Sequence, residues 1–90
     1  SELTAVECRR WAETLLQDDS RGDADRLRAL FERAYGRPPR DDETAASLAF
    51  LGDYDATLPP DVTDPHERRA RCWQSLCRAI LSANEFLYVE

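Results

Sequence analysis

Apolar side chains recur at helical spacing in four separate segments, and this pattern constrains the fold more than any other feature of the chain. The clearest stripe lies in the last segment and is formed by Trp73, Leu76, Cys77 and Ile80, with Leu81 beside them. Residues at these spacings share one face of a helix, and that face must be buried against another element. The sequence contains no credible pair of alternating strands. We therefore expect an all-α fold, a small bundle of four helices with a short packed C-terminal tail.

The first three helices are expected at residues 4–17, 24–35 and 42–54, and the fourth from residue 65 to a point between residues 82 and 84. In the first helix the apolar stripe consists of Cys8, Trp11, Ala12 and Leu15. In the second helix it consists of Leu27, Leu30, Phe31 and Ala34. In the third helix it consists of Ala45, Leu48, Ala49 and Leu51, with Phe50 beside it. Trp11 and Trp73 are the largest of these side chains. We therefore expect the first and fourth helices to be in contact, with both indoles central.

The helix ends are marked by residues that can bond free backbone groups. Asp23, Asp41 and Asp64 precede the second, third and fourth helices and are the expected N-caps. Glu67 stands three residues after Asp64 and is expected to complete a capping box. Gly36 follows the second helix, where a left-handed residue ends a helix without steric cost.

Length and charge limit the classes of protein to consider. Residues 1–90 suffice for a single helical domain, and the absence of Met suggests a piece of a longer chain. No run of about 18 apolar residues is present, so no membrane span is expected. The net charge of −6 opposes binding to a phosphate backbone, so nucleic acid is not an expected partner. The only tight basic cluster, Arg68, Arg69 and Arg71, is expected to form a solvated helix face.

The residue types that carry chemistry form no catalytic or metal-binding pattern. His66, the only histidine, has no facing nucleophile or carboxylate at helical spacing and is expected to be exposed. The acidic segment around Gly22 does not match a calcium loop, because the twelfth position counted from Asp18 is Ala29 rather than Glu. We therefore expect no cofactor, no metal site and no catalytic residue within this chain.

The three cysteines, Cys8, Cys72 and Cys77, lack the spacing of a zinc or haem site. Cys72 and Cys77 are five residues apart, which places them about 140° from one another around a helix and prevents their pairing. Cys8 and Cys77 are expected to be small buried hydrophobic residues. A disulfide between Cys8 and Cys77 stays open as an alternative.

Polar residues inside the hydrophobic end of the chain are the candidates for an interaction site: Asn84, Glu85 and Tyr88. Asn84 can end the fourth helix by entering the left-handed region. Glu85 can pair with an arginine of another helix, and residues 86–88 would then fold back onto the bundle. A contact of Asn84 and Glu85 with another domain or a ligand is the alternative.

Two phrases of the sequence resemble a known family. The first is Leu30-Phe31-Glu32-Arg33-Ala34-Tyr35-Gly36-Arg37-Pro38-Pro39 with the acidic residues 41–43, and the second is Leu81-Ser82-Ala83-Asn84-Glu85-Phe86-Leu87-Tyr88-Val89. Together they are similar to the C-terminal region of a planctomycete family of cytochrome-c-associated proteins of unknown function. Arg40 departs from the pattern, because the family often has Ser or Thr after the prolines. The resemblance implies that this chain is the C-terminal fragment of a longer multidomain protein that is exported, periplasmic or otherwise. A haem-binding segment, if the parent has one, would lie outside this chain.

These observations favour a non-catalytic helical module that serves packing or protein interaction within a larger exported protein. Its expected partners are the upstream domains of the parent chain, and its oligomeric state is left open. The alternative is an accessory part of a parent enzyme or electron-transfer protein, which shapes a site whose catalytic groups lie upstream.

Overall fold

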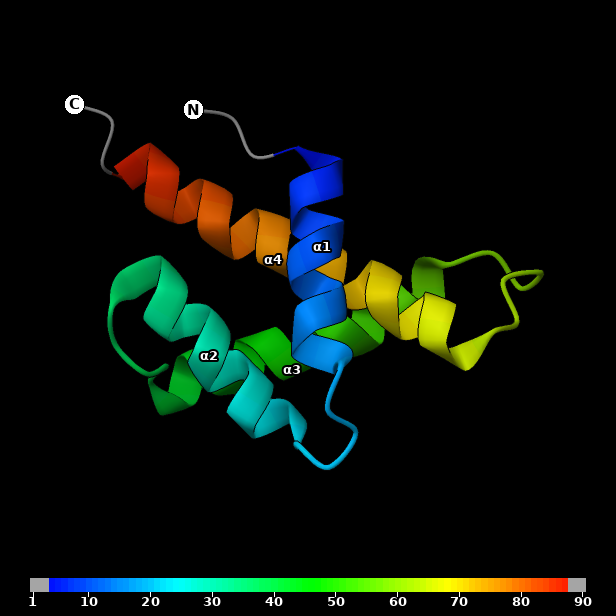
Figure 1. Ribbon diagram of the computed structural model, residues 1–90, viewed down its shortest axis with the longest axis horizontal. Helices are drawn as coiled ribbons and strands as arrows, with labels where there is room; N and C mark the ends of the chain where they lie inside the picture. Colours follow the sequence, from blue (N-terminus) through cyan, green and yellow to red (C-terminus); the bar gives the residue numbers. More distant parts are fainter. Residues whose placement is uncertain (1–3, 88–90) are drawn as a thin grey trace.

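The computed structural model describes residues 4–87, and of residues 84–87 it describes the helical backbone only. The described chain forms four helices: α1 (Ala5–Leu16), α2 (Asp23–Tyr35), α3 (Asp41–Thr57) and α4 (Pro65–Leu87). In Figure 1, α1 (blue) crosses the middle of α4 (yellow to red). Residues 4–87 contain no strand, so the prediction of a small all-α bundle is confirmed.

α4 is the central element, because it contacts each of the other three described helices and packs most extensively against α1. Its start agrees with the sequence in part: Asp64 Oδ1 accepts a hydrogen bond of 3.3 Å from the His66 backbone N–H, and Pro65 occupies the first helical position. The predicted capping box is not formed, because the Glu67 carboxylate is bound by Arg9 and Arg71 instead. Its end does not agree, because the helix continues past the expected stop to Leu87. Asn84 therefore lies within the helix and does not terminate it.

No helix within residues 4–87 carries the length of apolar sequence that a bilayer crossing needs. The apolar side chains are gathered instead in one core between the helices. Its largest fully buried members are Trp73, Leu27, Leu30, Cys8 and Cys77. They come from α1, α2 and α4, which are the three helices with the clearest sequence stripes.

The two tryptophans differ in position. Trp73 is 0% exposed and lies in the core, as predicted. Trp11 is only half-buried, and the Arg33 guanidinium lies over its ring, 4.5 Å from the centroid. The predicted contact between the first and fourth helices is confirmed, but only one of the two indoles is central.

α2 begins one residue earlier than predicted, at Asp23, and its N-cap is Gly22. The prediction that Asp23 caps this helix is wrong, because its carboxylate is bound by the guanidinium groups of Arg26 and Arg69. The end is as expected: Gly36 has φ 71° and ends the helix in the left-handed conformation.

Arg26 ties the end of α1 to the start of α2, although its side chain is buried and the residue is only 6% exposed. Its Nε donates to the Leu15 carbonyl at 2.9 Å, and its Nη2 donates to the Asp18 carbonyl at 2.9 Å. Its Nη1 forms an ion pair with Asp23 at 2.9 Å. Each nitrogen of the buried guanidinium therefore has a partner, as a buried charge requires.

α3 turns a different face to the core from the one predicted. Its buried residues are Ser47 and Leu51, and the half-buried aromatic residues Phe50 and Tyr54 lie beside them. Ala45, Leu48 and Ala49, which formed most of the predicted stripe, are exposed, and Leu48 is 43% exposed. The aromatic side bears more apolar area, so burying it releases more free energy than burying the alanines.

The ends of α3 also correct the sequence reading. Arg40, rather than Asp41, is the N-cap residue, and its backbone N–H donates to Glu43 Oε1 at 2.8 Å. The same carboxylate receives two hydrogen bonds from the Arg37 guanidinium, which fixes the link between α2 and α3. The helix then runs on to Thr57, three residues beyond the predicted end.

Candidate functional site

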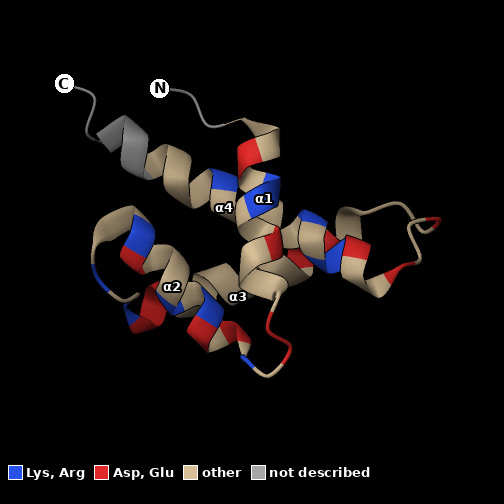
Figure 2. Ribbon diagram, in the orientation of Figure 1, with Lys and Arg blue, Asp and Glu red and all other residues tan. Residues whose placement is uncertain are grey.

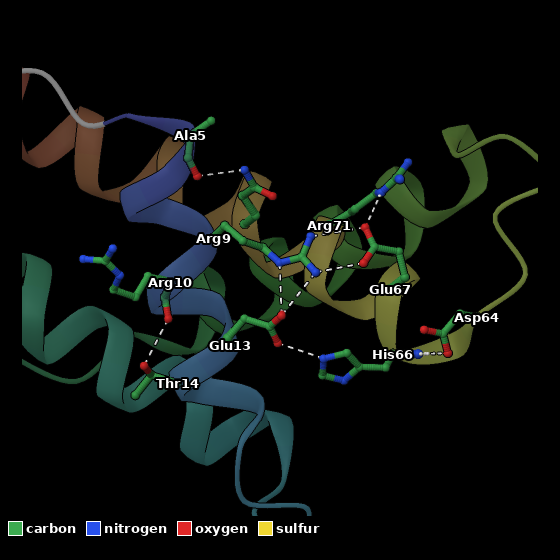
Figure 3. Close-up of polar contacts among 10 residues, drawn as sticks. Ala5, Arg9, Arg10, Glu13, Thr14, Asp64, His66, Glu67 and Arg71 are labelled. Carbon is green, nitrogen blue, oxygen red and sulfur yellow. Dashed lines mark hydrogen bonds and ion pairs between the residues drawn. The ribbon is translucent and has the colours of Figure 1, made fainter.

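A chain of ion pairs joins α1 to the first turns of α4, and Arg9 is at its centre (Figure 3). The Arg9 guanidinium binds Glu13 on its own helix at 3.1 Å and Glu67 of α4 at 2.8 Å. Glu67 also accepts a hydrogen bond of 2.8 Å from Arg71 Nε. At the other end, His66 Nε2 lies 2.8 Å from Glu13 Oε1. From Arg71 through Glu67 and Arg9 to Glu13, positive and negative groups therefore alternate across the contact between the two helices.

This arrangement stabilises the ionised forms of its carboxylates. Hydrogen bonds from Arg9, and then from Arg71, lower the pKa of Glu67 to about 2. The hydrogen bond with His66, followed by those from Arg9, lowers the pKa of Glu13. The pKa of Arg9 is raised above its ordinary value chiefly by its bond to Glu67. These groups therefore stay charged near neutral pH and hold the helices together rather than exchange protons.

The ion pairs form one wall of a groove of about 420 Å³ between α1, α3 and α4. Its lining comprises Arg9, Tyr54, Leu58, Glu67, Arg71, Gln74, Ser75 and Arg78. On α4, Arg71, Ser75 and Arg78 are four and three residues apart, which places them on one helix face. Tyr54 of α3 and Leu58, the residue that follows this helix, complete the lining.

Several hydrogen-bond donors in the groove have no partner among residues 4–83. Arg71 uses its Nε for Glu67, and neither of its Nη atoms makes a hydrogen bond there. Arg78 is exposed and forms no ion pair within the same residues. The hydroxyls of Tyr54 and Ser75 are likewise without a partner in that part of the chain. Gln74, in contrast, is used to bond the Ala5 carbonyl at 2.9 Å.

The charge of the groove is opposite to the charge of the whole protein. Its lining holds three arginines and one glutamate, while the chain carries a net charge of −6. Figure 2 shows basic segments of α1 and α4 near the crossing of these helices, with acidic segments beside them. α2 carries both charges, whereas α3 carries acidic residues and no Lys or Arg. The groove is therefore a local positive site on an acidic surface, and it can bind an anion by charge-assisted hydrogen bonds.

The predicted interaction residues lie elsewhere. Asn84 and Glu85 belong to the last turns of α4, and Tyr88 lies outside the described residues. Their role in a contact stays a prediction. The groove was missed at the sequence level, although the spacing of Arg71, Ser75 and Arg78 on one helix face was a visible signal.

The basic cluster 68–71 is not the solvated face that was expected. Arg68 pairs with Asp55 of α3 at 2.9 Å, and it also donates to the Asp55 carbonyl and to two backbone carbonyls of the link before α4. Arg69 pairs with Asp23 at 2.7 Å, and Arg71 pairs with Glu67. Each of these arginines therefore joins α4 to another part of the bundle or to its own preceding turn.

The other residues singled out from the sequence have structural positions. Cys8, Cys72 and Cys77 are buried free thiols, so the alternative of a disulfide between Cys8 and Cys77 is not realised. The His66 side chain is 58% exposed, as expected, although it has the Glu13 partner that sequence spacing did not reveal. Within the described residues, no three side chains of His, Cys, Asp or Glu gather closely enough to hold a metal ion.

The ion pairs of Glu67 are expected to loosen in acid. The folded pKa of Glu67, about 2, lies below its ordinary value of 4.5, so the stabilisation is complete above pH 4.5 and is lost as the pH falls toward 2. We expect the free energy of unfolding of the natural protein to exceed that of Glu67→Gln at neutral pH, and this difference to shrink below pH 4.5. Urea unfolding at several pH values measures both. A difference that stays constant down to pH 2 would contradict the assignment of these ion pairs.

A comparison with protein-family models, curated proteins and solved structures gave no match for this chain.

Proposed function

We propose that this domain is a non-catalytic protein-interaction module that binds its partner through the groove between α1, α3 and α4. The partner is another segment of a longer parent chain, as the sequence led us to expect, or a separate protein. The observation that carries the proposal is a set of donors in the groove that have no partner among residues 4–83: the Nη atoms of Arg71 and the guanidinium of Arg78. The neighbouring arginines 9, 68 and 69 are all used within the bundle.

Two further considerations support a binding role. Hydrogen-bond donors without a partner contribute little to folding, so their convergence in a concave site is more useful for recognition than for stability. The titratable groups beside the groove, Glu67 and Glu13, are held in their charged forms by arginine and histidine partners, which suits them to positioning rather than to proton transfer. Membership of the planctomycete family and export from the cell stay predictions from the sequence.

Site-specific photocrosslinking tests this proposal in the cells that naturally make the protein. A photoreactive residue at Ser82 would probe the groove, because Ser82 is exposed and lies four residues after Arg78 on the same helix face. The matched control is the same residue at Ala24, which is exposed on α2. We expect a defined crosslinked product from position 82 only, and its loss when Arg71→Gln and Arg78→Gln are combined.

The outcomes distinguish the candidate functions. A product that maps to a parent segment carrying a haem or an active site would favour the accessory role in a parent enzyme or electron-transfer protein. Equal products from positions 82 and 24, or none from either, would contradict the proposed module. A product at position 82 that survives the double arginine substitution would place the contact on α4 but outside the groove.

A further inference from the structure

The two arginines that lack full sets of partners are spaced along α4 in a way that limits their ligand. Arg71 and Arg78 are seven residues apart, so their Cα atoms are separated by about 10 Å along the helix axis. Helical side chains lean toward the N-terminus in the same direction, which keeps the two charged groups apart. A ligand that uses both arginines therefore needs two anionic groups at a similar spacing.

Arg71 is prepared for binding before any ligand arrives. Its Nε donates to Glu67 at 2.8 Å, and Glu67 is itself held by Arg9 at 2.8 Å. This chain of contacts fixes the plane of the Arg71 guanidinium while its two Nη atoms stay without a partner among residues 4–83. A planar group with two parallel N–H donors matches the two oxygens of a carboxylate. Fixing it in advance lowers the entropy lost on binding.

The rest of the groove suits a short polypeptide segment. Ser75 lies between the two arginines on α4, and its hydroxyl can donate to a carboxylate or bond a peptide group. Tyr54 and Leu58, which are both half-buried, line the α3 side and offer apolar contact together with one further hydroxyl. A peptide in the polyproline II conformation has three residues per turn and advances about 3.1 Å per residue, so two acidic residues three positions apart lie on the same side and about 9 Å from one another.

We propose that the groove binds an acidic segment of a partner protein in the polyproline II conformation, with one carboxylate on Arg71 and a second, three residues away, on Arg78. This inference rests on the proposed function, because it names the chemistry of the partner at the same groove. Double-stranded DNA fits less well, because it brings a negative charge about every 1.7 Å of its axis to a protein of net charge −6. The groove offers it two arginines, Arg71 and Arg78, whose Nη atoms have no partner among residues 4–83, and Arg71 already pairs with Glu67.

The test uses the 90-residue chain labelled with nitrogen-15 and a synthetic peptide that carries two aspartates separated by two glycines. Shifts of the backbone amide signals on titration report the site and the affinity. We expect the largest shifts at Arg71, Ser75 and Arg78, and weaker binding as the salt concentration rises. A peptide with asparagine in place of both aspartates, one with adjacent aspartates, and inorganic phosphate serve as competing ligands.

Substitution of each arginine tests the two contacts separately. Arg71→Gln and Arg78→Gln should each weaken binding about tenfold or more, since each removes charge-assisted hydrogen bonds. Arg28→Gln is the matched control, because it removes an exposed positive charge from α2, away from the groove, and should leave the affinity within about twofold. Thermal unfolding of every variant, followed by circular dichroism, confirms that each is folded.

Three results would overturn the inference: no shifts in the groove, an equal loss of affinity in Arg28→Gln, or phosphate binding as tightly as the spaced peptide. The last result would show a general anion site. The inference and the proposed function can fail independently. Crosslinking from position 82 to a partner without an acidic segment would refute this ligand chemistry alone, while peptide binding without any crosslink in cells would refute the interaction role.

Discussion

Replacement of Trp73 by alanine is expected to lower the free energy of unfolding by about 3–5 kcal/mol. The indole is 0% exposed and lies on α4, which contacts every other described helix, so the cavity left behind would border the whole core. A domain of this size has a total stability of about 5–15 kcal/mol and is expected near the lower end of that range. Urea unfolding followed by circular dichroism measures the loss, and a substantial unfolded fraction without denaturant is the expected result.

Two matched substitutions separate the loss of packing from other effects. Trp11→Ala removes the same side chain from a half-buried position and is expected to cost clearly less, because less apolar area leaves water there on folding. Trp73→Phe is expected to restore most of the stability lost in Trp73→Ala. It keeps most of the ring volume and removes the buried Trp73 Nε1–H, which has no hydrogen-bond partner within the described residues. Equal losses for Trp11→Ala and Trp73→Ala would contradict our description of the core.

Replacement of Arg26 by alanine is expected to cost about 2–4 kcal/mol, although an arginine in a helix is usually an exposed residue that tolerates substitution. Removing its guanidinium leaves the carbonyls of Leu15 and Asp18 without this donor and takes one of two cationic partners from Asp23. The link between α1 and α2 should then loosen. Hydrogen exchange of the amides in residues 15–23, together with urea unfolding, measures both effects.

The control is Arg28→Ala, two residues along the same helix, where the side chain is exposed and a change below about 0.5 kcal/mol is expected. Arg26→Lys should recover only part of the stability, because a lysine presents a single ammonium group in place of a planar fork that reaches two carbonyls and a carboxylate. If Arg26→Ala is as stable as Arg28→Ala, the buried link described here is not important for folding.

The sequence predicts those helices well in which one face is much more apolar than the rest. In α2 and α4 the stripes of Leu27, Leu30, Trp73 and Leu76 are buried as expected, because large side chains occur on one side only. α3 has small apolar residues on the side opposite its aromatic residues, so helical spacing alone allowed two faces. The choice depends on the area that Phe50 and its neighbours bury against α4, and this is known only once the helices are packed.

The caps show a similar limit. Asp23 and Glu67 have the residue type and position of capping groups, yet both are bound by arginines from distant parts of the chain. A carboxylate gains more from a charge-assisted bond to a guanidinium than from a backbone N–H at a helix start. The local sequence shows the backbone N–H groups at the start of a helix, but it does not show an arginine from a distant part of the chain. A cap predicted from local sequence therefore fails wherever the fold brings such an arginine near the carboxylate.

The sequence predicts only the α4 side of the candidate groove. The shared helix face of Arg71, Ser75 and Arg78 follows from their spacing, but the lining is completed by Tyr54 and Leu58, and their position depends on the orientation of α3. The predicted site at Asn84 and Glu85 was chosen because polar residues interrupt an apolar end. That signal marks an unusual segment, whereas a binding groove also needs walls from other elements.

The reactivity of the three buried cysteines reports how often the folded protein opens. Burial raises the pKa values of Cys8, Cys72 and Cys77, and that of Cys77 reaches about 12. Only about one molecule in 10⁵ would then carry the reactive thiolate of Cys77 at pH 7, and the surrounding helices shield it from solvent. Alkylation of these thiols therefore requires α4 to separate from the neighbouring helices. The rate of alkylation measures how often this opening occurs.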